Sequence, residues 1–500
     1  MNILFLNPIN LYKRWPIPND FTRFAFNPPA VSFPQLSACL PERHKYELVD
    51  GIVRKVTIKE LEKRLKDKNV VGISCCHGGA SLNTELNIKL IKKIKPNIKI
   101  VLGGMHATAY AKEWVERGAD FIVEGEGEVT FKELIDALEL KGNLRAVKGI
   151  SFRLNGYYVS NPGRDLIKDL DTLPMPKWDL LNFNDYGNRP SEKFTATIET
   201  SRGCNFKCDF CPIHNYWGQT QRFKSTARII DELLLLKKLG IKKVLFGDDT
   251  FGNNYYRDKR LVEEMLRLNL GIRWFCFSRA DSILKHKNFY KLAVKAGLEC
   301  ILVGFESMND RSLSLHNKYN GHPLSLEDYK EVFKFLKNND IFTIGLFIVG
   351  YPGELIKDAK FTLTNYSQIC NFPLFSPFRP EKSANAYSLF KKESNEESFY
   401  YDAHIKFAEF EKFKGIWKKS VLVSFFRPLF KIFSKHMFTR HFFLNLYRYL
   451  FAEIADFNYN KLKDVFFLVF GVSNSLDCKS YKHNIVDRYL NKKFIFKLKK

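Results

Sequence analysis

Short apolar strand patterns that alternate with amphipathic helix patterns constrain the fold of this chain more than any other feature. Within residues 1–150, helix patterns at 57–65 and 85–95 separate the strands, and Leu86, Leu90 and Ile94 lie on one face of the second helix. Because such alternation produces parallel βαβ units, it predicts an α/β domain over 1–150 with a doubly wound, flavodoxin-like or Rossmann-like sheet. The expected strands are residues 3–6, 46–49, 70–74, 98–102 and 121–123.

A second series of strand and helix patterns begins near residue 191. Repeated βα units of this kind predict a full or partial TIM-like (β/α) barrel over 191–375. Polar residues follow the expected strands, at the end of a barrel where active sites are built. The strands are expected at 195–199, 243–246, 274–277, 300–303 and 342–349, and the helices between them at 228–239, 284–296 and 326–337.

Two further segments flank the barrel. Residues 151–190 contain Asn155-Gly156, an NPG at 161–163 and a PMP at 174–176, all turn or breaker signals, so we predict a linker there. Residues 376–500 are rich in Lys and Phe and lack βα units, and we predict a mostly helical C-terminal extension. The expected organisation is therefore 1–150, 151–190, 191–375 and 376–500.

The positive charge of the chain is unevenly distributed. The formal net charge is +25, and residues 401–500 hold 20 Lys and Arg against 8 Asp and Glu. Nucleic-acid binding is disfavoured because no recognisable nucleic-acid module accompanies the charge. Residues 421–450 interleave aromatic with basic side chains. They fit either a helical cap over the barrel, which we favour, or an amphipathic surface in peripheral contact with a membrane.

The composition points to a globular protein of a reducing compartment. Hydrophobic residues make up 45% of the chain and charged residues 27%. No stretch reaches the ~18 uncharged apolar residues of a membrane span, and the first residues do not form a secretory signal pattern. The ten cysteines do not suggest a disulfide framework in a chain of this length. We expect a cytoplasmic protein, with peripheral membrane contact left open.

Three cysteines are spaced as Cys204-x3-Cys208-x2-Cys211. Thiolates are the preferred ligands of iron–sulfur clusters, and three of them on a compact loop would leave one iron of a [4Fe–4S] cubane open. With His214 the same cysteines could form a closed Cys3His zinc site. The cluster is favoured because the loop follows the first strand of the expected barrel, whereas structural zinc sites usually organise small domains that lack a core.

This loop, with Phe210 before its last cysteine, resembles the radical SAM superfamily. The N-terminal βα series resembles the cobalamin-binding domain that often precedes such a barrel. The phrases that carry this second resemblance are VLGGMHAT at 101–108, GEGE at 125–128 and LDTLPMP at 170–176. The resemblance covers roughly residues 1–375 and leaves out the C-terminal region.

The radical SAM resemblance implies a site for S-adenosylmethionine. Cys204, Cys208 and Cys211 would hold the cluster, and Phe210 would lie near the adenine. Asp248 would receive the methionyl ammonium, and Arg279 would bind the methionyl carboxylate. Glu306 would form a hydrogen bond with the ribose or the amino group. Gly350 would let the adenine lie against the backbone. Other interpretations stay open: Asp248 would cap a turn, and Arg279 would pair with Glu306.

The cobalamin-domain resemblance implies a corrinoid against the carboxyl edge of the first sheet, with its nucleotide tail inserted alongside. The expected contacts are Ser74, Gly103, Gly104 and Gly125. The Asp-x-His-x-x-Gly motif that supplies a lower axial histidine in some relatives is absent, since residues 7–10 read NPIN. His77 and His106 stand near strand ends, but loop histidines that only make hydrogen bonds are commoner. A domain that has lost cobalamin binding is the alternative.

The resemblance implies an enzyme that cleaves S-adenosylmethionine to a 5′-deoxyadenosyl radical. Methyl transfer from cobalamin to an unactivated carbon is the leading hypothesis. Oxidative cyclisation or rearrangement is the second, and a non-catalytic sensor that bears an iron–sulfur cluster, a corrinoid or zinc is the third. The implied partners are a small-molecule substrate, which the Phe-rich tail suggests is apolar, and an electron donor such as flavodoxin or ferredoxin. The catalytic residues and the substrate are not predicted.

Overall fold

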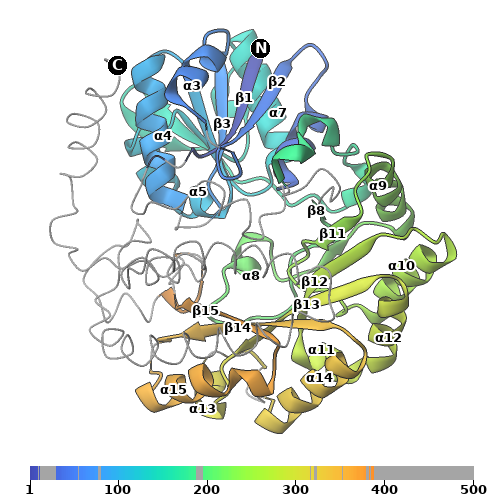
Figure 1. Ribbon diagram of the computed structural model, residues 1–500. Helices are drawn as coiled ribbons and strands as arrows, with labels where there is room; N and C mark the ends of the chain where they lie inside the picture. The colour runs from blue at the N-terminus through green and yellow to red at the C-terminus, as the bar shows by residue number, and fades with distance from the viewer. Residues whose placement is uncertain are drawn as a thin grey trace, which may run out of the picture.

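The structure is a computed structural model of the 500-residue chain, and two α/β bodies stand one above the other in it (Figure 1). The expected helical extension at 376–500 lies almost wholly outside the described residues, as does His77. Residues described are 1–9, 11, 30–54, 56–76, 80–186, 195–315, 317–319, 324–351, 353–378, 382 and 384–387.

The N-terminal body is built on a seven-stranded sheet with the order β2-β1-β3-β4-β5-β6-β7, of which the first five strands are parallel. This confirms the predicted doubly wound α/β fold. The strand order reverses between β1 and β3, which is where sheets of this kind bind ligands. These strands are β1 (Asn2–Asn7), β2 (Lys45–Asp50), β3 (Val70–Ser74), β4 (Lys99–Gly103) and β5 (Phe121–Val123).

Helices cover both faces of this sheet. One face packs α3, α4, α5 and α6 in a core that includes Leu61, Ile88 and Trp114, and the other packs α2 and α7 through Phe33 and Phe131. Each helix contributes an apolar stripe, so both faces of the parallel sheet are buried. The helices are α2 (Ser32–Cys39), α3 (Ile58–Leu65), α4 (Ser81–Ile94), α5 (Met105–Ala109), α6 (Ala111–Glu116) and α7 (Gly127–Leu140).

The segment predicted as a linker begins with regular structure. Strands β6 (Ile150–Leu154) and β7 (Tyr157–Ser160) form an antiparallel hairpin, and β6 pairs antiparallel with β5, so both extend the first sheet. Asn155 and Gly156 both have positive φ, 52° and 87°, as the two central residues of a tight hairpin turn require. The turn was visible in the sequence, but the strands on either side of it were missed.

The second body is a six-stranded parallel sheet with the order β8-β11-β12-β13-β14-β15. Neighbours in sequence are neighbours in space, which confirms a partial (β/α) barrel, and the helices lie outside it (Figure 1). The strand β15 was not predicted. The strands are β8 (Thr195–Ile198), β11 (Lys243–Phe246), β12 (Arg273–Arg279), β13 (Leu298–Glu306), β14 (Phe342–Val349) and β15 (Phe372–Pro377).

The helices predicted at 228–239 and 326–337 are present, whereas the chain differs from the prediction at 284–296. There the chain forms two helices that break at His286, where φ is −121° and ψ is 39°. The helices are α9 (Thr226–Lys238), α10 (Tyr255–Arg267), α11 (Ala280–Lys285), α12 (Lys287–Lys295), α13 (Asp310–Leu315), α14 (Leu326–Asn338) and α15 (Ile356–Asn365).

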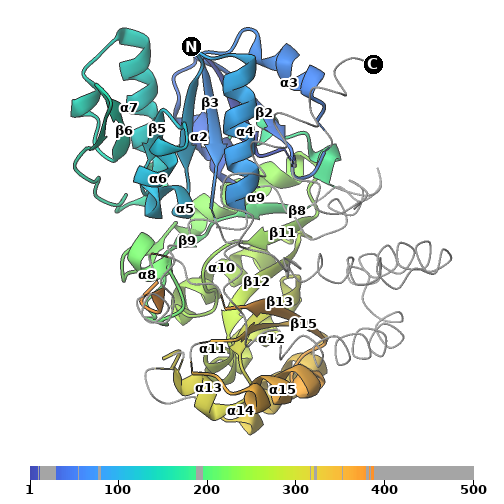
Figure 2. The same cartoon turned by 90° about the vertical axis from the view of Figure 1, so that its left-hand side faces the viewer.

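The three motif cysteines lie on a loop that a short antiparallel ribbon closes. Strands β9 (Ser201–Arg202) and β10 (Arg222–Phe223) pair so that Arg202 faces Arg222. The loop between them carries the short helix α8 (Ile213–Tyr216), and Figure 2 shows β9 and α8 at the level where the two bodies meet. The ribbon therefore forms the neck of the cysteine loop.

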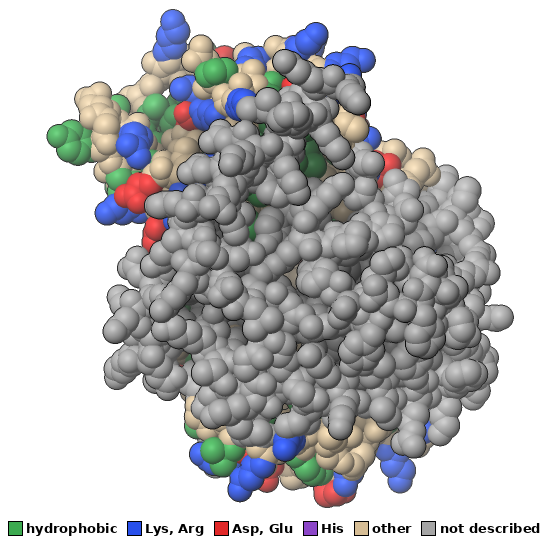
Figure 3. Space-filling view, turned by 60° about the vertical axis from the view of Figure 1, so that its left-hand side comes forward, with side chains coloured by type: hydrophobic (Ala, Val, Ile, Leu, Met, Phe, Trp, Pro, Cys, Tyr) green, Lys and Arg blue, Asp and Glu red, His purple; other side chains and the backbone are tan. Residues whose placement is uncertain are grey.

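No helix within the described part of the chain has the length and apolarity needed to cross a membrane. On the face shown in Figure 3, Lys and Arg are more prominent than Asp and Glu among the described side chains at the margins, in keeping with the net charge of +25.

Candidate functional site

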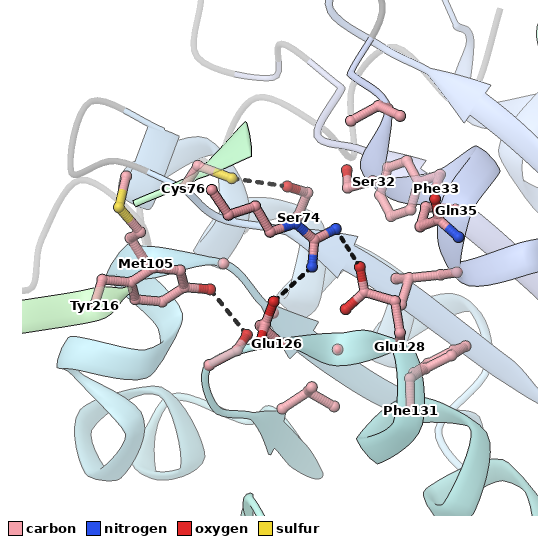
Figure 4. A pocket seen from close by; sticks show the side chains of 18 of the residues that line it. Ser32, Phe33, Gln35, Ser74, Cys76, Met105, Glu126, Glu128, Phe131 and Tyr216 are labelled. Carbon is pink, nitrogen blue, oxygen red and sulfur yellow. Dashed lines mark hydrogen bonds and ion pairs between the residues drawn. The ribbon is translucent and has the colours of Figure 1, made fainter. Parts of the chain in front are cut away.

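A cavity of about 290 Å³ lies between the two bodies, at the carboxyl ends of both sheets. Ser74 and Cys76 reach it from the end of β3, and Glu126 and Glu128 point into it from the start of α7 (Figure 4). The barrel body contributes a second group of residues. This group is Glu199, Ser201, Arg202, Ile213, Tyr216, Trp217, Gly247 and Asp249.

All four residues predicted to contact the corrinoid line this cavity, namely Ser74, Gly103, Gly104 and Gly125. Gly104 has a φ of 106°, and a Cβ added there would lie 2.8 Å from the carbonyl oxygen of Cys75. Gly125 has a φ of 70°. Glycine is therefore needed at position 104 for both conformation and space, which lets the backbone form the wall of the cavity.

The cavity continues into the first body between the sheet and helices α2 and α7. Phe5, Phe33, Val101 and Phe131 line this apolar part. Gly72 in β3 also lines it, and a Cβ there would lie 3.2 Å from the ring of Phe5. An apolar slot beside a polar mouth suits a corrinoid whose tail inserts alongside the sheet. Sequence reasoning missed Gly72, although a glycine inside a strand is a known sign of close approach.

His106 does not line the cavity. It is 1% exposed, its Nδ1 accepts a hydrogen bond of 3.1 Å from the indole Nε1 of Trp114, and its ring stacks on Tyr110 at a centroid distance of 4.6 Å. Its ring is thus held in the core of the first body, in agreement with the hydrogen-bonded alternative.

The three motif thiols are surrounded by protein and by cationic groups. Burial raises the pKa of Cys204, Cys208 and Cys211, in the last case to about 12. Arg279 Nη1 lies 3.9 Å from Cys208 Sγ. A guanidinium beside buried sulfur compensates negative charge, so the loop fits a ligand that binds as thiolates.

The spacing of these side chains tests the zinc alternative. In a tetrahedral site with Zn–S bonds of 2.3 Å, sulfur atoms lie about 3.8 Å apart. Among the described residues, only His44, Asp136 and Glu139 form a group of three or more His, Cys, Asp or Glu ligand atoms within 4.8 Å of one another. His214 instead lies 3.4 Å from Asn385 Oδ1 through its Nε2. The three thiols and His214 are therefore not drawn together as the ligands of a closed zinc site would be.

Arg279 and Glu306 do not pair with each other. Arg279 donates to Asp281 at 2.8–3.3 Å and to the carbonyl oxygen of Lys318 at 3.1 Å. Glu306 accepts from Lys318 Nζ at 2.6 Å. Arg279 also lies over the ring of Phe206, 3.5 Å from its centroid. The alternative of a rim ion pair between Arg279 and Glu306 is therefore wrong, and both side chains remain beside the cysteine loop.

Asp248 is 1% exposed and is fully engaged by the start of the cysteine loop. Its carboxylate accepts from the backbone N–H of Thr200 at 2.6 Å and of Ser201 at 3.1 Å, and from both hydroxyls. Burial raises its pKa, and the positive charge of Arg257 and the bonds from Thr200 oppose that rise. The geometry is that of an anchor for the loop, close to the turn-capping alternative.

The neighbouring Asp249 faces the cavity and was not predicted. It lines the cavity and accepts from the backbone N–H of Gly203 at 3.1 Å. Asp249 keeps an exposed surface at the open cavity, but desolvation by the surrounding protein raises its pKa to about 7, and the adjacent Asp248 acts in the same direction. The sequence shows Asp248 and Asp249 as consecutive carboxylates, but it does not indicate which of the two is buried and which lies at the cavity.

Phe210 and Gly350 are two of the residues predicted to contact S-adenosylmethionine. Phe210 packs against a small cluster that includes Tyr351 and Phe378. Gly350 has a φ of 83°, and its N–H donates to Glu354 at 2.6 Å. Burial raises the pKa of Glu354 to about 7. Phe210 therefore packs on a cluster that contains Tyr351, the residue that follows Gly350.

Comparison with known proteins identifies both bodies. The model of the B12 binding domain matches residues 22–135, and the model of the radical SAM superfamily matches residues 198–364. An uncharacterized methyltransferase of Pyrococcus horikoshii, PH0819, is 30% identical over 443 residues, which are 83% of this chain and 91% of the relative. The chain belongs to the B12-binding radical SAM family.

Proteins with other names are also similar to this chain. An anaerobic magnesium-protoporphyrin IX monomethyl ester cyclase of Cereibacter sphaeroides is 27% identical over 69% of this chain, and the chain spans 59% of that protein. The structure of the radical S-adenosylmethionine methyltransferase TsrM of Kitasatospora setae, with cobalamin and a [4Fe–4S] cluster bound, has the same fold. Its TM-score is 0.62 at 18% identity, over 78% of each chain.

The family membership confirms the coarse predictions from the sequence. The chain is a B12-dependent radical SAM enzyme, and relatives named as methyltransferases and cyclases support this interpretation over a non-catalytic sensor. The cofactors expected from the sequence, a [4Fe–4S] cluster, S-adenosylmethionine and cobalamin, are those of this B12-binding radical SAM family.

Proposed function

We propose that this enzyme transfers a methyl group to an unactivated carbon of a small molecule. The observation that carries the proposal is the single cavity between the two sheets, bordered by the predicted corrinoid contacts on one side and by the neck of the cysteine loop on the other. When bound, the reduced cluster would supply the electron that cleaves S-adenosylmethionine, and the corrinoid would supply the methyl group.

Cys204, Cys208 and Cys211 are the proposed ligands of the cluster. Their Cx3Cx2C spacing on one loop supports this role, as does the guanidinium of Arg279 beside Cys208. Arg279 is held in place by Asp281 and by the ring of Phe206, so its charge stays fixed beside the loop. A fixed cation next to the cluster favours the more negatively charged state of that site.

The proposed contacts of S-adenosylmethionine are Phe210, Asp248, Arg279, Glu306 and Gly350, as predicted from the sequence. Geometry favours adding Asp249 to this set, because its carboxylate faces the cavity while that of Asp248 is taken up by Thr200 and Ser201. In this arrangement Asp248 orients the loop, and Asp249 would receive the methionyl ammonium.

Ser74, Gly103, Gly104 and Gly125 are the proposed contacts of the corrinoid. Three of them are glycines, which present backbone amides and no side chain to a bulky ligand. The apolar slot lined by Phe5 and Phe131 would exclude water from the inserted tail. No histidine among the described residues lines the cavity.

Oxidative cyclisation or rearrangement is the second candidate. The 27% identity to a magnesium-protoporphyrin monomethyl ester cyclase over 69% of this chain favours it. The proposed partners are a small-molecule substrate, with an apolar one suggested by the Phe-rich tail, and an electron donor such as flavodoxin or ferredoxin. Peripheral membrane contact through 376–500 stays a prediction.

The proposal is tested on the anaerobically reconstituted full chain. A [4Fe–4S]⁺ electron paramagnetic resonance signal that changes when S-adenosylmethionine is added would support the radical SAM site. With candidate substrates, methyl transfer consumes two equivalents of S-adenosylmethionine and yields S-adenosylhomocysteine, 5′-deoxyadenosine and a methylated product. Consumption of one equivalent without a methylated product would favour cyclisation, and a signal indifferent to S-adenosylmethionine would reject both functions.

A further inference from the structure

Two arginines face each other at the neck of the cysteine loop. The register of the β9–β10 ribbon sets Arg202 directly opposite Arg222, at the two ends of the loop that holds Cys204, Cys208 and Cys211. Both guanidiniums also lie over Trp217, at 5.5 and 5.8 Å from its ring. Directly opposed like charges disfavour strand pairing, so this neck needs a counter-charge.

Glu126 of the N-terminal body supplies that counter-charge to both arginines. It accepts from Arg202 Nη1 at 2.6 Å and from Arg222 Nη1 at 2.9 and 3.0 Å, and its side chain is 3% exposed. Its second oxygen also accepts from the backbone N–H of Ile167. A carboxylate of the first body is thus buried between the two strands that close the cysteine loop of the second body.

The two arginines depend on Glu126 to different degrees. Arg202 also reaches Glu128 at 2.5 Å and Glu199 at 3.0 Å, so it has three carboxylates. Arg222 has no other acidic partner in the described part of the chain, and its Nε and Nη2 are buried without a hydrogen bond there. Removing the charge of Glu126 would leave the Arg222 guanidinium buried without a counter-ion. Because an uncompensated buried charge destabilises the folded state, the β9–β10 ribbon would move to expose this side chain to water.

Glu126 is also part of the cavity wall. It follows Gly125, a proposed corrinoid contact, and precedes α7, whose first turn carries Glu128 (Figure 4). The hydroxyl of Tyr216, from α8 in the cysteine loop, donates to the carbonyl oxygen of Gly125 at 2.9 Å. The same four-residue stretch therefore touches the cavity, the neck of the loop and the helix inside the loop.

We propose that Glu126 is a positioning residue that couples the corrinoid site to the cluster loop. A ligand in the cavity restrains the backbone at 125–128. Through its ion pairs, Glu126 then also restrains the side chains of Arg202 and Arg222 at the neck of the cysteine loop. The inference rests on the proposed function only in taking the cavity as a corrinoid site. The role proposed for the Glu126 carboxylate is to link the corrinoid site to the cysteine loop, and neither site would need that link for binding its own cofactor.

Hydrogen exchange on the cluster-loaded full chain tests this coupling, with hydroxocobalamin as the probe. In the wild type we expect added hydroxocobalamin to slow amide exchange across 203–221 by about ten-fold. In Glu126→Gln, which keeps the shape but loses the charge, we expect hydroxocobalamin still to bind, as absorbance titration shows, and to slow this exchange less than two-fold. The matched control is Glu133→Gln, which removes a 40% exposed carboxylate from α7, the helix that follows Glu126, and should behave as the wild type.

Each outcome separates the coupling from the function on which it rests. Absence of hydroxocobalamin binding in the wild type would overturn both the corrinoid site and the coupling. Binding that leaves 203–221 unchanged in the wild type, or equal slowing in Glu126→Gln, would overturn the coupling alone. If Glu126→Gln does not fold, Arg222→Gln makes the same test, since Arg202 keeps its three carboxylates and only one side of the neck is released. If hydroxocobalamin slows amide exchange of 203–221 in Arg222→Gln by less than half as much as in the wild type, the coupling is supported. If it slows this exchange as much as in the wild type, the coupling is rejected.

Discussion

At the scale of single residues, the cavity depends on positions where backbone must come close to other backbone. Gly104 is the clearest of these because its φ of 106° is one that residues with a side chain rarely adopt. The same residue separates the end of β4 from α5, so a small shift there moves the wall formed by Cys75 and Cys76.

Gly104→Ala is expected to destabilise the protein and to weaken cobalamin binding. The new Cβ would lie 2.8 Å from the carbonyl oxygen of Cys75 and 3.0 Å from Cys76 Sγ. The strained backbone should cost about 1–3 kcal/mol in the free energy of unfolding. Displacement of the wall should raise the Kd of hydroxocobalamin about ten-fold. Thermal unfolding and absorbance titration measure the two effects, and Gly163→Ala, where nothing lies within 4 Å of an added Cβ, is the control.

Glu354 is expected to make stability depend on pH. Burial raises its pKa to about 7 from an ordinary value of 4.5, so the folded state binds the proton more tightly than the unfolded state. The stability from this group is then fully present below about pH 4.5 and is lost as the pH rises through about 7, by about 3 kcal/mol in total. Thermal midpoints of Glu354→Gln should therefore rise relative to those of the wild type across this range. Parallel pH profiles would contradict the assignment.

Single residues also mark the limit of prediction from sequence. The three cysteines could be proposed as cluster ligands because their spacing is local to one loop. The four predicted cavity contacts were found because residues at the carboxyl ends of parallel strands gather at one edge. The roles of Asp248 and Asp249 were not separable, because which of two consecutive side chains turns into the cavity depends on the loop from Thr200 to Gly203 that packs against them.

At the scale of elements, periodicity found long strands and helices and missed short ones. The strands β9 and β10 have two residues each, too few for any alternation, although they define the neck of the cysteine loop. The strand β15 includes two prolines, which argue against a strand except at an edge, and β15 is the edge strand of its sheet. These elements depend on their partners in space, which the sequence alone does not specify.

Asp248→Asn should loosen the β9 strand and lower the cluster content. The carboxylate accepts four hydrogen bonds from Thr200 and Ser201. An amide could keep its oxygen for the two backbone N–H groups, but its NH2 would face the two hydroxyls, which would have to turn from donating to accepting, and the negative charge would be lost. We expect a loss of about 2–3 kcal/mol in the free energy of unfolding. Iron and sulfide content after anaerobic reconstitution should fall with it. Asp231→Asn, exposed on α9, is the control, and wild-type iron content in Asp248→Asn would remove the anchoring role.

At the scale of the whole molecule, each sheet has its own apolar core, and the cavity lies where their carboxyl edges meet. Ion pairs and hydrogen bonds join the two bodies around it, as between Arg202 and Glu126. A ligand in this cavity touches both bodies, so it stabilises their relative position as well as the folded state of each.

Hydroxocobalamin should therefore stabilise the whole chain against unfolding, provided that its cavity is open. At a free concentration of about 100 times its Kd, a ligand that binds only the folded state adds about 2.7 kcal/mol. Ser74→Trp places an indole in the cavity and should abolish this gain, while Ser160→Trp, at an exposed position in β7, should leave it intact. Differential scanning calorimetry of cluster-loaded protein gives the midpoints with and without the ligand. An equal rise in both variants would mean that hydroxocobalamin binds somewhere other than between the two sheets.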